Sequence, residues 1–499
     1  MKREMSNSDL VNESGHPKGL YVLFGAEMWE RFSYYGMRAL LVLYMTDHMS
    51  FSDDAAYGVY GAYTALVYAT PVFGGMIADK ILGFRKAVML GGTLMALGHF
   101  AMAMESMLYV ALAFLIVGNG FFKPNISSIV GKLYKKGDPR RDAGFTIFYM
   151  GINLGAFLSP IVCGWLGQEV GWHWGFGLAG IGMIIGLVNF ALGSHRFAGL
   201  AEPPATDNHS VQVRNQWLVY IGAFLAVGVA WFLVRQTELV GYMLNGFGIF
   251  VLAALVAYMI SKCSSDERRA LIVALVLTAY SVLFWSFFEQ AGSSLNLFTE
   301  RNVNKSFFGW FEIPASVFQA VNAGFIVLLA PVFSMLWRGL AARGREPSTP
   351  VKFGLALIQL GLGFVALWAG AILFSEAGVV ALGWLILGYL LHTTGELCLS
   401  PVGLSMITRL SPMRIVGLMM GVWFLASAYA QYVAAGIARL MSIVGAEGGE
   451  GGVLEKEAMV QVYGNGFGQI ALFAIGGGFV MLIVSPILNR ILKSRTESS

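Results

Sequence analysis

The sequence predicts an all-α polytopic membrane protein, and three observations support this class. Hydrophobic residues make up 57% of the 499 positions and charged residues only 12%, against the roughly 25% charged residues that are usual in soluble domains. The mean hydropathy is +0.66, and 62 glycines are available to let helices pack closely. Apolar runs long enough to cross about 30 Å of hydrocarbon recur along the chain. Each run is therefore expected to form a transmembrane helix.

The apolar runs form three groups along the chain. Six precede a polar linker at residues 195–216, two shorter runs follow that linker, and six more complete the chain. The first six cover 20–46, 56–79, 86–104, 107–131, 142–167 and 172–193, the pair covers 217–234 and 240–260, and the last six cover 270–299, 311–337, 353–374, 378–408, 415–441 and 466–489. Two groups of six favour the internal duplication that is common in secondary transporters.

The expected organisation is two six-helix bundles joined through an inserted two-helix hairpin. It divides the chain into an N-terminal tail, a first bundle, a linker with the hairpin, a second bundle and a C-terminal tail, at 1–19, 20–193, 194–262, 263–493 and 494–499. Residues 1–18 are polar and charged, and the first apolar run is too long for a cleavable signal peptide. We therefore expect that run to be retained as a helix.

Lysine and arginine residues orient this arrangement in the membrane. With the N-terminus inside, the inner segments hold 25 of the 33 Lys and Arg residues, and the outer loops hold Arg235, Arg301, Lys305 and Lys456. Because cytoplasmic loops carry the excess of Lys and Arg, both termini are expected on the cytoplasmic side of the cell (inner) membrane. The net charge of +4 thus reflects topology and does not suggest nucleic-acid binding.

The stretch "EMWERFSYYGMR", residues 27–38, places four charged side chains within the first apolar run. At about 100° per residue, these charges and the two tyrosines between them share one face of a helix. The members are Glu27, Glu30, Arg31, Tyr34, Tyr35 and Arg38. A charge at the bilayer centre costs about 2.5 kcal/mol or more, so this face is expected to line a cavity. A salt-bridge cluster that only joins helices is the alternative.

Three later runs also contain a charged residue. Lys123 lies in the fourth run, Glu289 in the seventh principal run and Glu396 in the tenth. A cavity with separated cations and anions suits a zwitterion, whose carboxylate and ammonium groups need opposite partners. Aromatic residues accompany the charges and are candidates for apolar walls, although packing explains any single one as well: Tyr34, Tyr35, Tyr68, Trp285, Phe288, Trp423 and Phe424.

A short motif between the second and third runs has a known counterpart. The stretch "GGMIADKILGFRK" resembles the inner-loop motif of the major facilitator superfamily, with matches at Gly75, Asp79, Gly83, Arg85 and Lys86. A tight basic turn that obeys the positive-inside rule is the alternative.

Longer motifs resemble the proton-dependent oligopeptide transporter (POT) family, from about Leu20 to the C-terminus. "EMWERFSYYGMR" is similar to its E-x-x-E-R-F-x-Y-Y signature, and "GELCLSPVGLS" to its tenth-helix motif. "FFKPNISSIVGKLY" and the following "RRDAGFTIFYMGINLGAFLSP" resemble its second signature. The extra helix pair matches the bacterial members. The resemblance implies the major facilitator fold and a proton-coupled symporter that imports di- and tripeptides by alternating access, without a cofactor or metal.

The resemblance also implies roles for individual residues. The residues implied to bind the peptide carboxylate are Arg38 and Lys123, with Tyr34 and Tyr68 beside them. Those implied to bind the peptide amino terminus are Glu396, Asn153, Asn322 and Ser400. Those implied to contact the substrate side chains are Trp285, Phe288, Trp423 and Phe424. For proton coupling they are Glu27, Glu30, Arg31 and Glu289. Two gate pairs are implied, Arg38 with Glu289 on the outer side and Lys123 with Glu396 on the inner side.

Two positions depart from the family pattern. Many members carry a histidine on the second helix where this chain has Gly61, so carboxylates are expected to carry the proton coupling here. Some members have an asparagine before the tryptophan of the eleventh helix, where this chain has Val422, a change that is expected to affect substrate preference.

Other functions remain open from the sequence. A facilitator for another small solute, such as an amino acid, nitrate or a drug, has the same architecture, although nitrate would not require Glu396. A passive channel differs in that its substrate does not accumulate. A membrane-embedded enzyme is disfavoured, because the seven histidines form no metal-binding pair and no nucleophile or phosphate-binding motif is present. The expected partners are small peptides, protons and the lipid bilayer, and the expected functional unit is a monomer.

Overall fold

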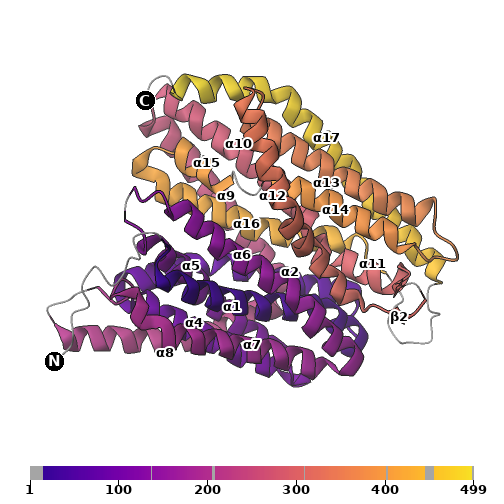
Figure 1. Ribbon diagram of the computed structural model, residues 1–499, viewed down its shortest axis with the longest axis horizontal. Coiled ribbons are helices and arrows are strands. Elements are labelled where there is room, and N and C mark those ends of the chain that lie inside the picture. Colours follow the sequence, from indigo (N-terminus) through magenta and orange to yellow (C-terminus); the bar gives the residue numbers. More distant parts are fainter. Residues whose placement is uncertain are drawn as a thin grey trace. The chain divides into compact units, whose positions relative to one another are not determined.

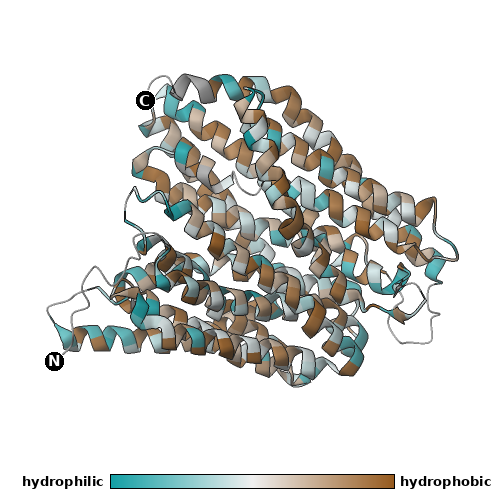
Figure 2. Ribbon diagram, viewed as in Figure 1, coloured by the Kyte–Doolittle hydropathy of each residue, from teal (hydrophilic) through white to brown (hydrophobic). Residues whose placement is uncertain are grey.

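The computed structural model describes residues 15–135, 137–204, 208–307, 309–399, 403–443 and 455–496 (Figure 1). These residues are helical almost throughout, with one short antiparallel hairpin of β1 (Ser306–Phe307) and β2 (Phe311–Glu312). Twelve of the described helices are long and apolar enough to cross a membrane. Figure 2 shows hydrophobic residues along the helices and hydrophilic residues gathered at many of their ends. The predicted all-α membrane class is confirmed.

The first compact unit contains Met1–Leu41, Leu66–Gln236 and Ser316–Ala323. Its helices are α1 (Lys18–Leu43), α3 (Pro71–Ile77), α4 (Phe84–Met102), α5 (Leu108–Lys132), α6 (Arg141–Ser159), α7 (Trp172–Gly193) and α8 (His209–Arg235). Helix α4 packs against both α5 and α7. A Cβ at Gly91 would lie 2.5 Å from the backbone oxygen of Gly118, so paired glycines bring α4 and α5 into backbone contact.

The second compact unit contains Val42–Ala65, Thr237–Ala315 and Gly324–Ser499. Its helices are most of α2 (Asp53–Ala69), α9 (Thr237–Lys262), α10 (Ser265–Phe288), α11 (Ser294–Asn302), most of α12 (Ala320–Ala342), α13 (Thr349–Ile372), α14 (Leu382–Leu399), α15 (Gly403–Leu410), α16 (Val416–Arg439) and α17 (Lys456–Thr496). Helix α13 packs against α14 and α17, and α10 packs against α16 (Figure 1). The bundle boundaries given by the sequence stay a prediction, and the compact units place Val42–Ala65 with the later helices.

Several predicted helical runs are interrupted in the structure. The second run breaks at Thr70 into α2 and α3, and Pro71 occupies the first turn of α3, where its missing N–H does no harm. The seventh principal run ends its α-helix at Phe288 and continues through a 3₁₀ turn, Glu289–Gly292, into α11. Periodicity of apolar residues does not reveal such breaks, because the burial pattern continues across them.

The inserted hairpin contributes one helix to each compact unit. Helix α8 packs on α5 in the first unit, and α9 packs on α10 and α16 in the second. A single residue, Gln236, separates the two helices. Two helices therefore occupy the two shorter apolar runs, and their pairing as a hairpin stays a prediction.

The facilitator-like loop forms a tight turn that contacts the linker. Gly83 has a φ of +76°, a left-handed conformation that favours glycine. Arg85 donates to both carboxylate oxygens of Glu202 at 2.6 and 3.1 Å, and its backbone N–H donates to the carbonyl of Ala201 at 2.9 Å. Arg85 of this motif thus holds the linker against the turn.

Candidate functional site

Three charged side chains of α1 form a buried cluster. Arg31 donates through Nε and Nη2 to the two carboxylate oxygens of Glu30, and its Nε lies 3.5 Å from Oε1 of Glu27. The ring centre of Tyr34 lies 5.1 Å from the guanidinium carbon of Arg31. The three charged side chains are at most 2% exposed. These charges therefore lie together inside the protein as an ion-pair cluster, the arrangement that the sequence left open as the alternative. That this face lines a cavity stays a prediction.

The cluster contains more carboxylates than cations. Two carboxylates share one guanidinium, and within the described residues Oε2 of Glu27 has no hydrogen-bond partner. The positive charge of Lys123 on α5 also acts on Glu27. A buried carboxylate that lacks a donor is costly to keep ionised. Glu27 is therefore the less well paired of the two acids.

Neighbouring helices hold the cluster in position. Asn119 of α5, which is 1% exposed, donates to Oε1 of Glu30 at 3.5 Å. On α6, a Cβ at Gly155 would lie 2.3 Å from the backbone oxygen of Met28 and 3.0 Å from the Cβ of Arg31. The absence of a side chain at this position lets α6 pack directly on the charged turn of α1.

Two predicted carboxylate-binding cations lie beside tyrosine rings in the first unit. Nζ of Lys123 lies 5.5 Å from the ring centre of Tyr68. The guanidinium carbon of Arg38, whose side chain is 8% exposed, lies 5.8 Å from the ring centre of Tyr35. Such cation–π contacts contribute about 0.5–2 kcal/mol each. Lys123 and Tyr68, which were predicted as neighbours at the carboxylate end, are thus brought together.

The two predicted asparagines also belong to the first unit. Asn153 of α6 is 7% exposed and donates to the carbonyl of Tyr149 on its own helix at 3.0 Å. Asn322 lies near the start of α12, in the segment Ser316–Ala323 that the first unit includes. Ser316 fixes that segment by donating to Oε1 of Gln168 through its backbone N–H at 3.0 Å and its hydroxyl at 2.6 Å.

In the second unit, Glu289 lies next to an aromatic cluster. It begins the 3₁₀ turn after α10 and is 5% exposed. The rings of Trp285 and Phe288 meet edge to face at 5.2 Å, and Phe284 stacks on Phe288 at 5.7 Å. The two aromatic residues predicted on this helix therefore pack against each other, and their role toward a substrate stays a prediction.

The remaining predicted residues of the second unit lie on α14 and α16. Glu396 of α14 is 7% exposed. A Cβ at Gly403 would lie 2.6 Å from the indole of Trp423, so that ring packs directly on the start of α15. Phe424 is 36% exposed. Ser400 lies outside the described residues.

The two predicted gate pairs each join residues of different compact units. Arg38 and Lys123 belong to the first unit, and Glu289 and Glu396 belong to the second. Their pairing stays a prediction. Within the described part of the chain, no group of three or more His, Cys, Asp and Glu residues is placed to hold a metal ion.

Sequence reasoning missed several buried polar residues. Asp53 accepts two hydrogen bonds from Arg301 at 2.7 and 2.8 Å, although both positions lie outside the apolar runs of the sequence. Asn119 and Gln290 are buried on helices and bond to residues of other helices. Because Asn119 and Gln290 are polar residues inside apolar runs, the sequence alone could have indicated that they are buried and hydrogen-bonded. No signal pairs Asp53 with Arg301, which are 248 positions apart.

The departures from the family pattern have local structural counterparts. A Cβ at Gly61 would lie 2.2 Å from the Cβ of Ala435, so a histidine there would require α2 and α16 to separate. Val422 lines an apolar groove between α9, α10 and α16.

Comparison with known proteins gives consistent matches over most of the chain. The profile described as PTR2, POT family, matches residues 85–453. The uncharacterised transporter YclF of Bacillus subtilis is 38% identical over 493 residues, covering 96% of this chain and 96% of that protein. A di-/tripeptide transporter of Lactococcus lactis subsp. cremoris is 38% identical over 446 residues, covering 85% and 90% of the two chains. A crystal structure of a mutant of peptide transporter POT in complex with alafosfalin superposes with a TM-score of 0.82 at 36% identity, covering 97% of both chains.

Proposed function

The chain belongs to the POT family, and we propose that it is a proton-coupled symporter that imports di- and tripeptides across the cell (inner) membrane by alternating access. Relatives that are 38% identical carry the name di-/tripeptide transporter. The proposal includes cytoplasmic termini, which the excess of inner Lys and Arg supports. It also includes a monomeric functional unit.

The observation that carries proton coupling is the unequal charge of the α1 cluster. Glu27 and Glu30 share Arg31, and Oε2 of Glu27 has no hydrogen-bond partner within the described residues. One proton neutralises the excess carboxylate of this trio. Its uptake and release therefore change the charge beside Lys123, which acts on Glu27 electrostatically. Glu289, buried in the second unit, is the fourth residue assigned to coupling.

Peptide recognition is assigned to two cations of the first unit, the buried Arg38 and the half-buried Lys123, and to the acid of the second unit. Arg38 and Lys123, with Tyr34 and Tyr68 beside them, bind the peptide carboxylate. Glu396 binds the amino terminus, because a buried carboxylate needs a cationic partner. The residues assigned to assist it are Asn153, Asn322 and Ser400. Those assigned to contact substrate side chains are Trp285, Phe288, Trp423 and Phe424.

Gating is assigned to ion pairs that alternate during the transport cycle. Arg38 pairs with Glu289 when the outer side is closed, and Lys123 pairs with Glu396 when the inner side is closed. Because the same two cations bind the substrate carboxylate, a bound peptide competes with the gate acids for them. This competition links peptide binding to opening.

A competition experiment tests the carboxylate assignment. Arg38→Ala removes a buried charge-assisted partner, which costs about 2–5 kcal/mol of binding, and Lys123→Ala removes a half-buried one, which costs less. Lys132→Ala is a matched control on α5, because Lys132 is exposed and contacts the ring of Phe84. We expect both site variants to lose the preference for a dipeptide over its C-terminal amide, whereas the control keeps it. Unchanged discrimination in both site variants would contradict the assignment.

A further inference from the structure

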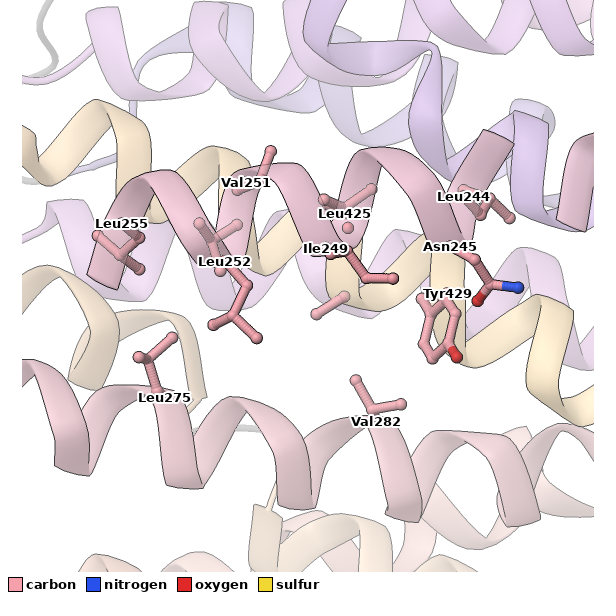
Figure 3. A pocket seen from close by; sticks show the side chains of 13 residues that line it. Leu244, Asn245, Ile249, Val251, Leu252, Leu255, Leu275, Val282, Leu425 and Tyr429 are labelled. Atoms are coloured by element: carbon pink, nitrogen blue, oxygen red, sulfur yellow. The ribbon is translucent and has the colours of Figure 1, made fainter. Parts of the chain in front are cut away.

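A groove in the second unit is lined by none of the residues assigned to bind peptide or proton, although its lining includes Val422, a position at which this chain departs from the family pattern. It has a volume of about 340 Å³ and is lined by side chains of α9, α10 and α16. Leucines and valines form most of its wall, including Leu244, Leu255, Leu275, Val282 and Leu425 (Figure 3). Asn245 and Tyr429 lie near each other at one end, and Leu255 and Leu275 lie toward the other. A groove with so few polar partners is a poor site for ordered water.

Contacts at both ends keep α9 from closing the groove. Toward one end, a Cβ at Gly241 would lie 1.9 Å from the hydroxyl of Tyr432, so α9 rests on α16 there. Toward the other end, Arg414 donates to the hydroxyl of Tyr258 at 2.9 Å and to both carboxylate oxygens of Glu267 at 2.8 Å. Helix α9 is thus held against its neighbours at two points, and the groove lies between them.

The groove is continuous with a surface suited to lipid. Helices α9, α10 and α16 each lie in a segment long and apolar enough to cross a membrane. The face of α9 next to the groove exposes large apolar side chains, including Phe250 at 67% and Ile249 at 70%. From Leu244 to Leu255 the helix rises about 16 Å at 1.5 Å per residue, which is close to half of the roughly 30 Å hydrocarbon thickness. That length fits a chain from one leaflet.

Cationic side chains predominate beyond the Leu255 end of the groove. The turn from α9 into α10, the first turn of α10 and the 3₁₀ turn before α16 carry Lys262, Arg268, Arg269 and Arg414 against Asp266 and Glu267. Within the described residues, Lys262 forms no ion pair, and Arg269 approaches Asp266 only at 3.9 Å. Anionic lipid headgroups are attracted by such basic clusters at the membrane surface.

We propose that this groove binds an anionic membrane phospholipid. One acyl chain lies between α9, α10 and α16, and the phosphate headgroup lies against the basic turn that contains Lys262 and Arg269. None of the residues assigned to bind peptide or proton lines this site. The inserted helix α9 then has a role as one wall of a lipid site.

Photo-cross-linking of the purified full-length protein tests the acyl-chain position. The probe is phosphatidylglycerol with a photoreactive group in its acyl chain, and the readout is labelled peptides from α9, α10 and α16. Gly248 lines the groove and Gly246 lies on the same helix outside it. A Cβ at either position meets no atom within 4 Å, so Gly248→Phe and Gly246→Phe are a matched pair. We expect Gly248→Phe to reduce labelling of these helices about tenfold, equivalent to about 1.4 kcal/mol, and Gly246→Phe to leave it unchanged.

Competition by unlabelled lipid tests the headgroup. We expect phosphatidylglycerol to displace the probe better than phosphatidylcholine, and this preference to disappear in the double variant Lys262→Gln, Arg269→Gln. Equal labelling of the Gly248→Phe and Gly246→Phe variants would overturn the acyl-chain site. Equal competition by the two lipids in the parent protein would overturn the anionic headgroup assignment.

Discussion

The buried ion pair of Asp53 and Arg301 should control how firmly α2 is attached to the later helices. Asp53, the first residue of α2, accepts from Arg301 at 2.7 and 2.8 Å and from the backbone N–H of Ile443 at 3.1 Å. Arg301 of α11 also donates to the hydroxyl of Tyr463 on α17 at 3.1 Å. The pair therefore joins α2, α11 and α17 at one end of the second unit.

The substitution Asp53→Asn keeps the shape of the side chain and removes its charge. Loss of one partner of a buried, hydrogen-bonded pair costs about 2–5 kcal/mol. Asp53 is 1% exposed but Arg301 is 17% exposed, so water reaches the remaining cation and we expect about 2–3 kcal/mol. This free energy weakens the attachment of α2 by roughly 30- to 150-fold. The sequence places this end of α2 on the outer side, so the variant should favour opening there.

Cysteine accessibility measures this opening. Ala62 of α2 is fully buried, and the three native cysteines are also buried. In an Ala62→Cys background, we expect Asp53→Asn to increase the rate of alkylation by a membrane-impermeant maleimide at least tenfold, the effect of about 1.4 kcal/mol.

The adjacent residue provides the control. Asp54 is 62% exposed and lies 3.4 Å from Nε of Arg439, and exposed pairs of this kind contribute about 0–1 kcal/mol. Asp54→Asn should therefore leave the alkylation rate within about fivefold of the parent. Equal rates for Asp53→Asn and Asp54→Asn, in variants that elute as intact protein, would refute the reasoning.

Three further predictions concern coupling, a loop acid and a helix contact. Glu27→Gln and Glu30→Gln should abolish gradient-driven uptake but retain exchange of peptide for peptide, as measured in proteoliposomes; full accumulation in both would return the cluster to a structural role. Hydrogen bonds from Arg140 lower the pKa of Asp138 from 3.8 to about 2. The stability that ionised Asp138 contributes is therefore present above pH 4 and lost as the pH falls through 2. The Tm difference between the parent and Asp138→Asn should shrink between these two pH values, and a constant difference would contradict the role of this ion pair. Gly155→Ala should lower the free energy of unfolding by about 1–3 kcal/mol through overpacking, seen as a lower Tm. Gly177→Ala is the control and should leave the Tm unchanged, because a Cβ at that position meets no atom within 4 Å. Equal Tm values for the two variants would contradict the close approach of α6 to α1.

The charged face of α1 could be predicted from the sequence because one helix contains all of it. Positions 27, 30 and 31 lie within one turn, so helical geometry alone brings their side chains together. The structure adds which acid is better paired. Arg31 makes two hydrogen bonds with Glu30 and only a 3.5 Å contact with Glu27, a difference that depends on the packing of α5 and α6.

Contacts between distant segments could not be predicted in the same way. Asp53 and Arg301 each look like a loop charge, and only the fold shows that one carboxylate accepts from a helix 248 positions away. The interruption at Glu289 was missed for a related reason. Burial continues across it, with Phe287 at 5% and Gln290 at 0% exposed, so burial alone gives no sign of the change from α-helix to 3₁₀ turn.

Gly61 shows what the sequence and the structure each reveal about one position. Comparison with the family pattern identified Gly61 as a departure and led to the expectation that carboxylates carry the coupling. The structure supplies the spatial reason, because Ala435 occupies the space that a side chain at 61 would need. A proton site made of Glu27, Glu30 and Arg31 does not depend on that position.

Uptake of a radiolabelled dipeptide into proteoliposomes containing the purified protein tests the central claim most directly. With an inward proton gradient, we expect the dipeptide to accumulate above its external concentration, and we expect a protonophore to reduce the internal level to equilibrium. Peptide that equilibrates without accumulating would indicate a passive channel or facilitator. Accumulation that persists at the same level after the protonophore, or no dipeptide uptake at all, would contradict proton-coupled peptide transport.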